Sequence, residues 1–254
     1  MTFEESLRAL ARLTDADLER EWMWPGKGRA NLRYAFFFIL QEEQAALVAA
    51  ASPTQEADRI LALAQRAFGD LRGILLAVPD DMLDREPAPH EWSVRRTMEH
   101  VIGVERSYRA NTQHALLRSD GEPLTIPADR RPKADPADTE GDGLAIALAL
   151  ARRRAETDSA LARTEASDLG RASQWAALNE PFNVDVRFRL HRFGAHLVEH
   201  KWQVEKTLRA LGQIETDAQA YVRQISILRS RHERRSPDGV RQRLDDAIAA
   251  IASA

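Results

Sequence analysis

Two histidines one helical turn apart could together hold a metal ion. His196 and His200 lie in residues 183–211, where apolar residues recur three or four positions apart, as on one face of a helix. Both imidazoles fall within that apolar stripe, and side chains at i and i+4 lie on the same face. Burying two polar rings costs free energy unless a partner satisfies them, and a metal ion does so directly. The pair therefore predicts a metal site, with hydrogen-bonded core histidines as the alternative.

His191 provides an internal control for this prediction. It precedes His200 by nine residues, which is about 180° around a helix at ~100° per residue, so we expect it to face solvent. The start of the segment is ambiguous, because residues 182–190 alternate strictly between apolar and polar types, as a strand does. The stripe that continues to Leu211 favours a helix from Asn183 onward.

A third histidine falls at the edge of another predicted helix, over residues 93–117. His100 stands beside the apolar Val101, and Gly103 would leave room next to it. The connection that follows, residues 118–142, is long, polar and rich in Pro and Asp. Such a connection is typically a lid, a binding loop or a mobile segment.

Helical periodicity and capping residues predict further helices along the chain. They cover residues 3–13, 31–51, a segment that starts at Ser52, 143–164 with Asp142 as its cap, a segment from Thr216, and 240–251. We expect Leu144 and Leu148 to face inward in the helix over 143–164. Ile225 and Leu228 should do the same in the helix that starts at Thr216.

These elements predict an all-α protein built around an antiparallel four-helix bundle, because most connections are short. Residues 52–212 would form the bundle with the metal site. Residues 1–51 would be an N-terminal helix pair packed on it. Residues 213–254 would be a C-terminal helical hairpin, with a surface that suits a homodimer.

Composition narrows the class of function. Among 254 residues, Lys plus Arg total 36 and Asp plus Glu total 39, and the net charge of −3 gives no general attraction to nucleic acid or membranes. The Arg-rich tail is interleaved with Asp, which favours a solvated hairpin over a nucleic-acid site. The chain has no cysteine, so it supplies neither a disulfide nor a thiolate. Without a signal-like start or a long apolar run, we expect a cytoplasmic protein.

The histidines and their neighbours carry a family resemblance. The run Trp92-Ser93-Val94-Arg95, the lone His100, and the string from His196 through His200 to Gln203 resemble the DinB/YfiT-like superfamily over about residues 55–212. The resemblance implies a four-helix bundle in which a divalent metal is held by His100 on the second helix and by His196 and His200 on the fourth. It places Gln203 beside them.

Three neutral imidazoles leave at least one position of a zinc ion open, as in catalytic sites. Zinc is our first expectation, with nickel or iron as alternatives, since imidazole suits all three. An open position can bind water or a thiol and lower its pKa. The family includes thiol transferases, and a chain without cysteine would need a diffusible low-molecular-weight thiol. We therefore expect a thiol-dependent transferase or hydrolase acting on a small molecule, with a non-catalytic metal-binding or stress-response bundle as the alternative.

Other side chains near the ligands are weaker candidates. Trp92, Tyr108, Asn111 and Gln203 could line the pocket. Ordinary packing for Tyr108 and a surface position for Asn111 are the favoured explanations, and anchoring of a helix start explains Trp92 equally well. The carboxylates near the histidines, at positions 99, 105 and 199, are expected to be solvated on helix flanks.

A competing motif overlaps the histidine pair. Residues 196–200 match the H-x-x-E-H pattern of one metallopeptidase class, in which Glu199 would be the general base. That class needs a further acidic ligand well downstream, and the residues after His200 predict only a helical hairpin. A metallopeptidase is therefore a minor alternative.

Overall fold

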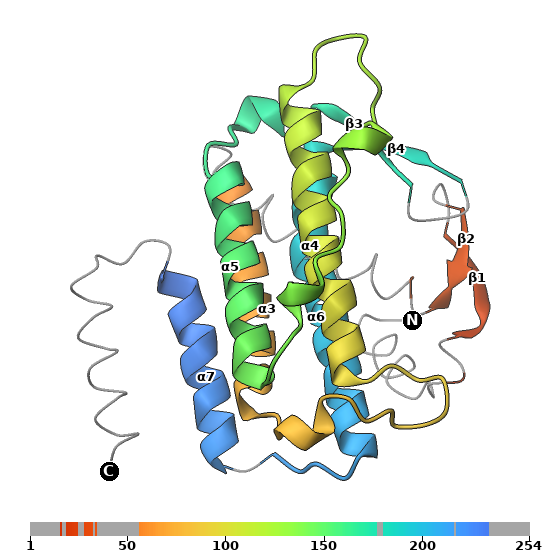
Figure 1. Cartoon of the computed structure of the whole chain (residues 1–254). Helices are drawn as coiled ribbons and strands as arrows, with labels where there is room; N and C mark the ends of the chain where they lie inside the picture. The colour runs from red at the N-terminus through yellow and green to blue at the C-terminus, as the bar shows by residue number, and fades with distance from the viewer. Residues whose placement is uncertain are drawn as a thin grey trace, which may run out of the picture.

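The computed structural model describes residues 16, 19–24, 28–32, 34, 56–176, 180–215 and 217–233. Four long helices form a bundle: α3 (Glu56–Ala77), α4 (Val94–Leu117), α5 (Gly143–Leu161) and α6 (Val186–Ala210) (Figure 1). The predicted all-α class with a four-helix bundle is confirmed. None of the helices in the described part of the chain is long and apolar enough to cross a membrane.

Contacts between helix ends fix the directions of the four helices. The end of α6 meets the start of α4, where the Thr207 hydroxyl donates to the carbonyl of Trp92, so these two helices are antiparallel. In contrast, Arg187 at the start of α6 pairs with Glu56 at the start of α3, so α3 and α6 run the same way. The connection over 118–142 returns along the bundle, and α5 therefore starts at the same end as α4 (Figure 1).

Side-chain caps define where the helices begin. Ser93 accepts a hydrogen bond from the amide of Arg96, and Asp142 accepts one from Ala145, as their positions in the sequence predicted. In α6 the cap is Asp185, which accepts from the amide of Phe188. The long helix therefore begins at Val186, three residues later than predicted.

The residues before α6 form a strand, so the helix predicted from Asn183 onward is wrong at its start. Strand β3 (Ala172–Trp175) pairs antiparallel with β4 (Phe182–Asp185). The alternation of apolar and polar residues at this point was a genuine strand signal. It could not be separated from the helical stripe because the pairing partner, β3, lies in a segment that gave no strand pattern.

A second hairpin lies near the N-terminus, mostly in residues 14–30, which no predicted element covered. Strand β1 (Glu21–Trp24) pairs antiparallel with β2 (Gly28–Asn31). The helices predicted over 3–13 and 240–251, most of the helix over 31–51, and the caps at Ser52 and Thr216 lie outside the described residues. The assignment of 1–51 and 213–254 as separate units therefore stays a prediction.

The bundle core consists of two apolar clusters with polar side chains between them. One cluster gathers around Leu71, Leu150 and Leu197, and the other around Ile60 and Phe193. Between them lie buried polar side chains of α3, α4 and α5, namely Gln65, Glu105, Arg154 and Asp158.

The inward face of α5 differs from the predicted one. Ile146 and Leu150 are fully buried, whereas Leu144 and Leu148 are 53% and 61% exposed. Alanine and leucine occur on most sides of this helix, so hydrophobic periodicity alone did not identify the buried face. The buried face is set by Arg154, a residue that a hydrophobic pattern assigns to solvent.

Helix α7 (Asp217–His232) lies along α3 and contacts it through small residues. An added Cβ on Gly69 would lie 2.7 Å from the Ser226 carbonyl oxygen, and one on Gly73 would lie 2.7 Å from the Cα of Arg223. Ile225 and Leu228, predicted to face inward, are 45% and 58% exposed. The two helix axes approach closely because Gly69 and Gly73 have no side chain, and Arg72 and Arg223 add polar contacts between the helices.

The close approach of α7 predicts opposite effects for two helical glycines. Gly73→Ala should lower the free energy of unfolding by about 1–3 kcal/mol, since overpacking forces backbone shifts. Gly103→Ala is the matched control, because an added Cβ there meets nothing within 4 Å. It should raise stability by about 0.5–1 kcal/mol through helix propensity. Urea denaturation followed by circular dichroism measures both, and a stabilising Gly73→Ala would contradict the packing of α7.

Candidate metal centre

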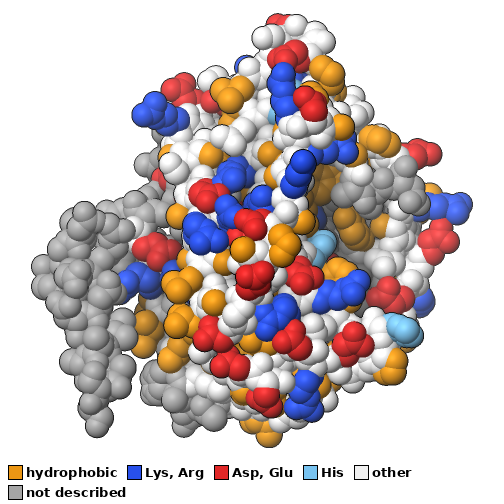
Figure 2. Space-filling view, viewed as in Figure 1, with side chains coloured by type: hydrophobic (Ala, Val, Ile, Leu, Met, Phe, Trp, Pro, Cys, Tyr) orange, Lys and Arg blue, Asp and Glu red, His pale blue; other side chains and the backbone are white. Residues whose placement is uncertain are grey.

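Three imidazoles from two helices meet inside the bundle. His100 comes from α4, and His196 and His200 come from successive turns of α6. The Nε2 atoms of His100 and His196 are 3.1 Å apart, and one ring nitrogen from each of the three residues lies within 4.8 Å of the others. His196 and His200 are each 6% exposed, and His100 is half-buried. Figure 2 shows a histidine beside a hollow in this face of the molecule.

A hydrogen bond orients one of the three rings. The Nδ1 atom of His200 lies 2.7 Å from Oε1 of Gln203, one turn further along α6. An amide oxygen can only accept, so Nδ1 carries the proton and the lone pair of His200 is on Nε2. Partners of this kind fix the tautomer of histidines that bind metals. Gln203, which the family resemblance placed beside the histidines, thus contacts one of them directly.

Burial keeps the three imidazoles neutral. Burial lowers the pKa of His100. The pKa of His200 is lowered to about 4, first by burial and then by the positive charges of His100 and Arg192. The pKa of His196 is lowered well below its usual value, first by burial and then by His200 and His100. Neutral rings have free lone pairs, which is the form that binds a metal ion.

This set of donors fits a divalent metal ion. Three imidazole lone pairs converge, and within the described residues no carboxylate joins the group as a fourth ligand. Three protein ligands leave a coordination position open, in contrast to closed structural sites with four. Assignment of the three histidines as ligands remains a prediction, now with a geometry that suits it.

His191 does not face solvent, so the prediction for it is wrong. It is 1% exposed. The helical-wheel argument assumed that α6 has a solvent face, but every residue from Arg189 to Leu197 is buried. Since α6 is covered on all sides over this stretch, angular position does not distinguish ligand from non-ligand. His191 nevertheless lies outside the three-histidine group.

Two of the other pocket candidates lie beside the imidazoles. The ring centre of Trp92 is 5.3 Å from that of His100, and the ring centre of Tyr108 is 5.4 Å from that of His196. Asn111 instead donates to the backbone carbonyl of Ser107 on its own helix, which is a local contact. Trp92 and Tyr108 therefore form part of the wall around the centre.

Two residues near the centre were not identified from the sequence. The guanidinium of Arg192 lies 3.4 Å from the Tyr108 hydroxyl and 5.1 Å from the ring centre of Trp175. Arg192 precedes His196 by four residues, so the same i, i+4 rule that paired the histidines could have found it. Trp175 belongs to β3, and nothing in the sequence pattern linked that strand to the centre.

The three carboxylates near the histidines have different surroundings. Glu105 is 3% exposed and pairs with Arg154 at 2.7 Å, so its expected solvation is wrong. Burial raises the pKa of Glu105, although Arg154 opposes that shift. Glu199 is partly buried, with Oε2 3.9 Å from Nε2 of His200. Glu99 is exposed, as expected.

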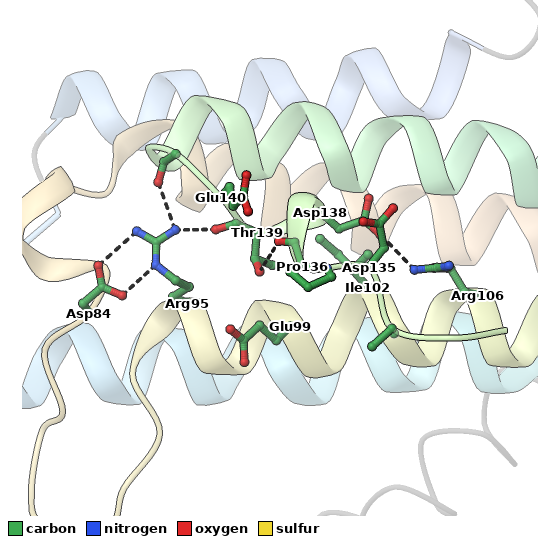
Figure 3. A pocket seen from close by; sticks show the side chains of 13 residues that line it. Asp84, Arg95, Glu99, Ile102, Arg106, Asp135, Pro136, Asp138, Thr139 and Glu140 are labelled. Carbon is green, nitrogen blue, oxygen red and sulfur yellow. Dashed lines mark hydrogen bonds and ion pairs between the residues drawn. The ribbon is translucent and has the colours of Figure 1, made fainter.

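The long connection over 118–142 does not cover the centre. It is tied to α4 by Arg95, which bonds Asp84 and the carbonyls of Thr139 and Gly141, and by Arg106, which pairs with Asp138 (Figure 3). Between these ties lies a hollow of about 570 Å³. None of the three histidines lines it.

The metallopeptidase alternative gains no support from this geometry. The third imidazole, His100, comes from upstream of the H-x-x-E-H pattern, whereas that class takes an acidic ligand from downstream. Among the described residues after His200, no carboxylate belongs to the group.

Comparisons with known proteins agree with this description. Residues 63–204 match the family model of the DinB superfamily. Among solved structures, the chain is similar to YfiT from Bacillus subtilis, described as "a probable metal-dependent hydrolase with an unusual four-helix bundle topology". The TM-score is 0.51 at 14% sequence identity, and the match covers 65% of this chain and 92% of YfiT. No protein with a curated description matches the sequence.

The depressed pKa of His200 predicts a pH dependence of stability in the metal-free protein. Its pKa is about 4 in the folded chain against 6.5 in the unfolded chain, so the unfolded state takes up the proton first. This stabilisation is complete above pH 6.5 and is lost as the pH falls through 4. The loss should be roughly 3 kcal/mol by pH 4.

Urea denaturation of EDTA-treated protein at several pH values measures this loss. His200→Gln removes the titrating group and should flatten the decline between pH 6.5 and 4 relative to the unchanged protein. Parallel curves for the two proteins would show that His200 is protonated as easily in the folded chain as in the unfolded one.

The bond between Gln203 and His200 predicts a loss of metal affinity when the amide is removed. Gln203→Met keeps the side-chain length but cannot fix the tautomer, so zinc affinity should fall about 10- to 100-fold. Competition with a fluorescent chelator measures the affinity. Gln224→Met, on the exposed face of α7, is the control and should change nothing. Equal affinities for both variants would assign Gln203 a packing role only.

Proposed function

Because the chain belongs to the DinB superfamily, we propose that it is a metal-dependent enzyme acting on a small molecule, with His100, His196 and His200 as the ligands of a zinc ion. The observation that carries the proposal is the convergence of three neutral imidazoles from α4 and α6 on one point. A bound zinc ion supplies Lewis acidity, which lowers the pKa of a water or thiol in its open position.

The protein's own residues would prepare this position. Gln203 holds the proton of His200 on Nδ1, which keeps Nε2 available as a ligand. The rings of Trp92 and Tyr108 pack against His100 and His196 and limit the access of bulk water. A less hydrated site strengthens each electrostatic contact within it.

Glu199 is the best placed proton acceptor. Its carboxylate lies 3.9 Å from Nε2 of His200, close to the centre but outside the group of ligand atoms. A carboxylate at this distance can take a proton from a nucleophile that is bound beside the histidines. We assign it the role of general base.

Hydrolysis is the reaction we place first, because water is the simplest nucleophile for such a site and YfiT is described as a probable metal-dependent hydrolase. Transfer of a low-molecular-weight thiol is the second reaction. The chain has no cysteine, so any thiol would have to diffuse in and bind in the same open position.

Zinc content and hydrolysis of 4-nitrophenyl acetate test the proposal together. His196→Ala should lose both zinc and activity. Glu199→Gln should keep zinc but lose activity about 100-fold, since a positioned base contributes roughly 10²–10⁴-fold. His90→Asn, which changes an exposed histidine, should alter neither property. Repeating the assay with a small added thiol distinguishes thiol transfer from hydrolysis.

Unchanged zinc content in His196→Ala would remove the centre and the proposal with it. Full activity in Glu199→Gln would leave the centre in place and reject this carboxylate as the base. Stoichiometric zinc binding without turnover of the ester, with or without thiol, would support the non-catalytic alternative.

A further inference from the structure

The hollow between α4 and the connection over 118–142 has the size of a ligand site (Figure 3). Its volume of about 570 Å³ is within the range of roughly 300–1,000 Å³ that is typical of small-molecule pockets. The three histidines are not among the 13 residues that line it in the described part of the chain. The hollow is therefore separate from the candidate metal centre, and the proposed function gives it no role.

Ion pairs hold the two walls of the hollow in place. Asp138, on the connection, is buried and pairs with Arg106 of α4. It also pairs with Arg152 and Arg153 of α5, and Asp135 pairs with Arg153 as well. Because the connection is fastened to two helices, its distance from α4 is fixed. The hollow is thus preformed, which reduces the cost of binding a ligand.

The two arginines that line the hollow are engaged by the protein itself. Arg95 donates through Nε and Nη2 to the carboxylate of Asp84. Its Nη1 donates to the backbone carbonyls of Thr139 and Gly141. Arg106 is paired with the buried aspartate of the connection. An anion that entered the hollow would have to compete with these internal partners.

Two glutamates in the lining are not engaged in this way. Glu99 comes from α4 and Glu140 from the connection (Figure 3). Glu99 acts on Arg95 through its charge, but in the described part of the chain neither glutamate side chain forms a hydrogen bond or an ion pair. An ionised carboxylate only accepts hydrogen bonds, so these two groups suit a ligand that donates them and carries a positive charge.

Apolar residues complete the lining. Ile102, Ala134 and Pro136 lie in it, and Ile102 is almost fully buried. Gly103 widens the hollow, because an added Cβ at this position would meet nothing within 4 Å. The hollow can therefore take an apolar group beside a charged one.

We propose that this hollow binds a small organic cation. Its amidinium, guanidinium or ammonium group pairs with the carboxylates of Glu99 and Glu140, and its apolar part packs on Ile102 and Pro136. Charge-assisted hydrogen bonds are roughly twice as strong as neutral ones, so the positive group determines which molecules bind. The site does not depend on the metal ion, and this inference goes beyond the proposed function.

Fluorine NMR with 4-fluorobenzamidine and its neutral isostere 4-fluorobenzamide tests the inference. The amidinium should bind at least tenfold more tightly than the amide. Glu99→Gln and Glu140→Gln should each weaken amidinium binding at least fivefold without changing zinc content. Asp120→Asn, which changes an exposed carboxylate outside the hollow, is the matched control and should bind like the unchanged protein.

Gly103→Leu tests the position of the site without changing a charge. Side chains on a helix tilt toward its N-terminus, so a leucine here would lie over the turn that carries Glu99 and fill part of the hollow. It should weaken amidinium binding at least tenfold. Undiminished binding in this variant would place the probe elsewhere on the protein and overturn the inference.

Zinc-loaded and EDTA-treated protein should bind the amidinium equally, because a protonated amidine has no lone pair for a metal ion. Binding that requires zinc would assign the probe to the histidine centre and overturn the inference. Equal binding of the two probes, or binding of neither, would do the same, and this comparison needs no variant that folds. A protein that takes up no zinc but binds the amidinium through Glu99 would reject the proposed function alone.

Discussion

The structure depends on the satisfaction of polar groups buried halfway along the bundle. Arg154 is 1% exposed and donates to Glu105 of α4, to Gln65 of α3 and to Asp158 on its own helix. A buried charge that loses a partner destabilises a protein strongly, because desolvation is no longer compensated. Sliding any of these helices by one turn would separate the partners. This layer of buried polar side chains therefore specifies how α3, α4 and α5 are positioned relative to one another along the bundle axis.

The same layer positions the candidate metal centre. Glu105 fixes the position of α4 along the bundle axis, and His100 lies between one and two turns before Glu105 on that helix. On α6, the ring of Phe193 packs against Arg154, with the guanidinium 5.2 Å from the ring centre. Phe193 precedes His196 by one turn, so this contact fixes the position of α6 close to the histidines. The meeting of the imidazoles thus follows from contacts made elsewhere in the core. A centre held in this way is preorganised, as an open catalytic site requires.

The sequence predicted features that depend on local chemistry. The caps at Ser93 and Asp142, the bundle class and the pairing of His196 with His200 follow from spacing and side-chain type, whereas the position of His100 beside that pair was implied by the family resemblance. The sequence pattern failed to predict features that depend on a partner far away in the chain. Glu105 is buried because Arg154 lies opposite, His191 is buried because α6 is covered on all sides, and β4 exists because β3 pairs with it. No pattern within one segment reveals those partners.

Charge links Arg192 to the histidines of α6. Neutral imidazoles bring no negative charge to a divalent ion, unlike the carboxylate and thiolate ligands of other zinc sites. Arg192 precedes His196 by four residues, and its charge lowers the pKa of both His196 and His200. Burial lowers the pKa of the same two histidines. Arg192 and burial therefore act in the same direction, because each of them favours the neutral imidazoles that a metal ion requires.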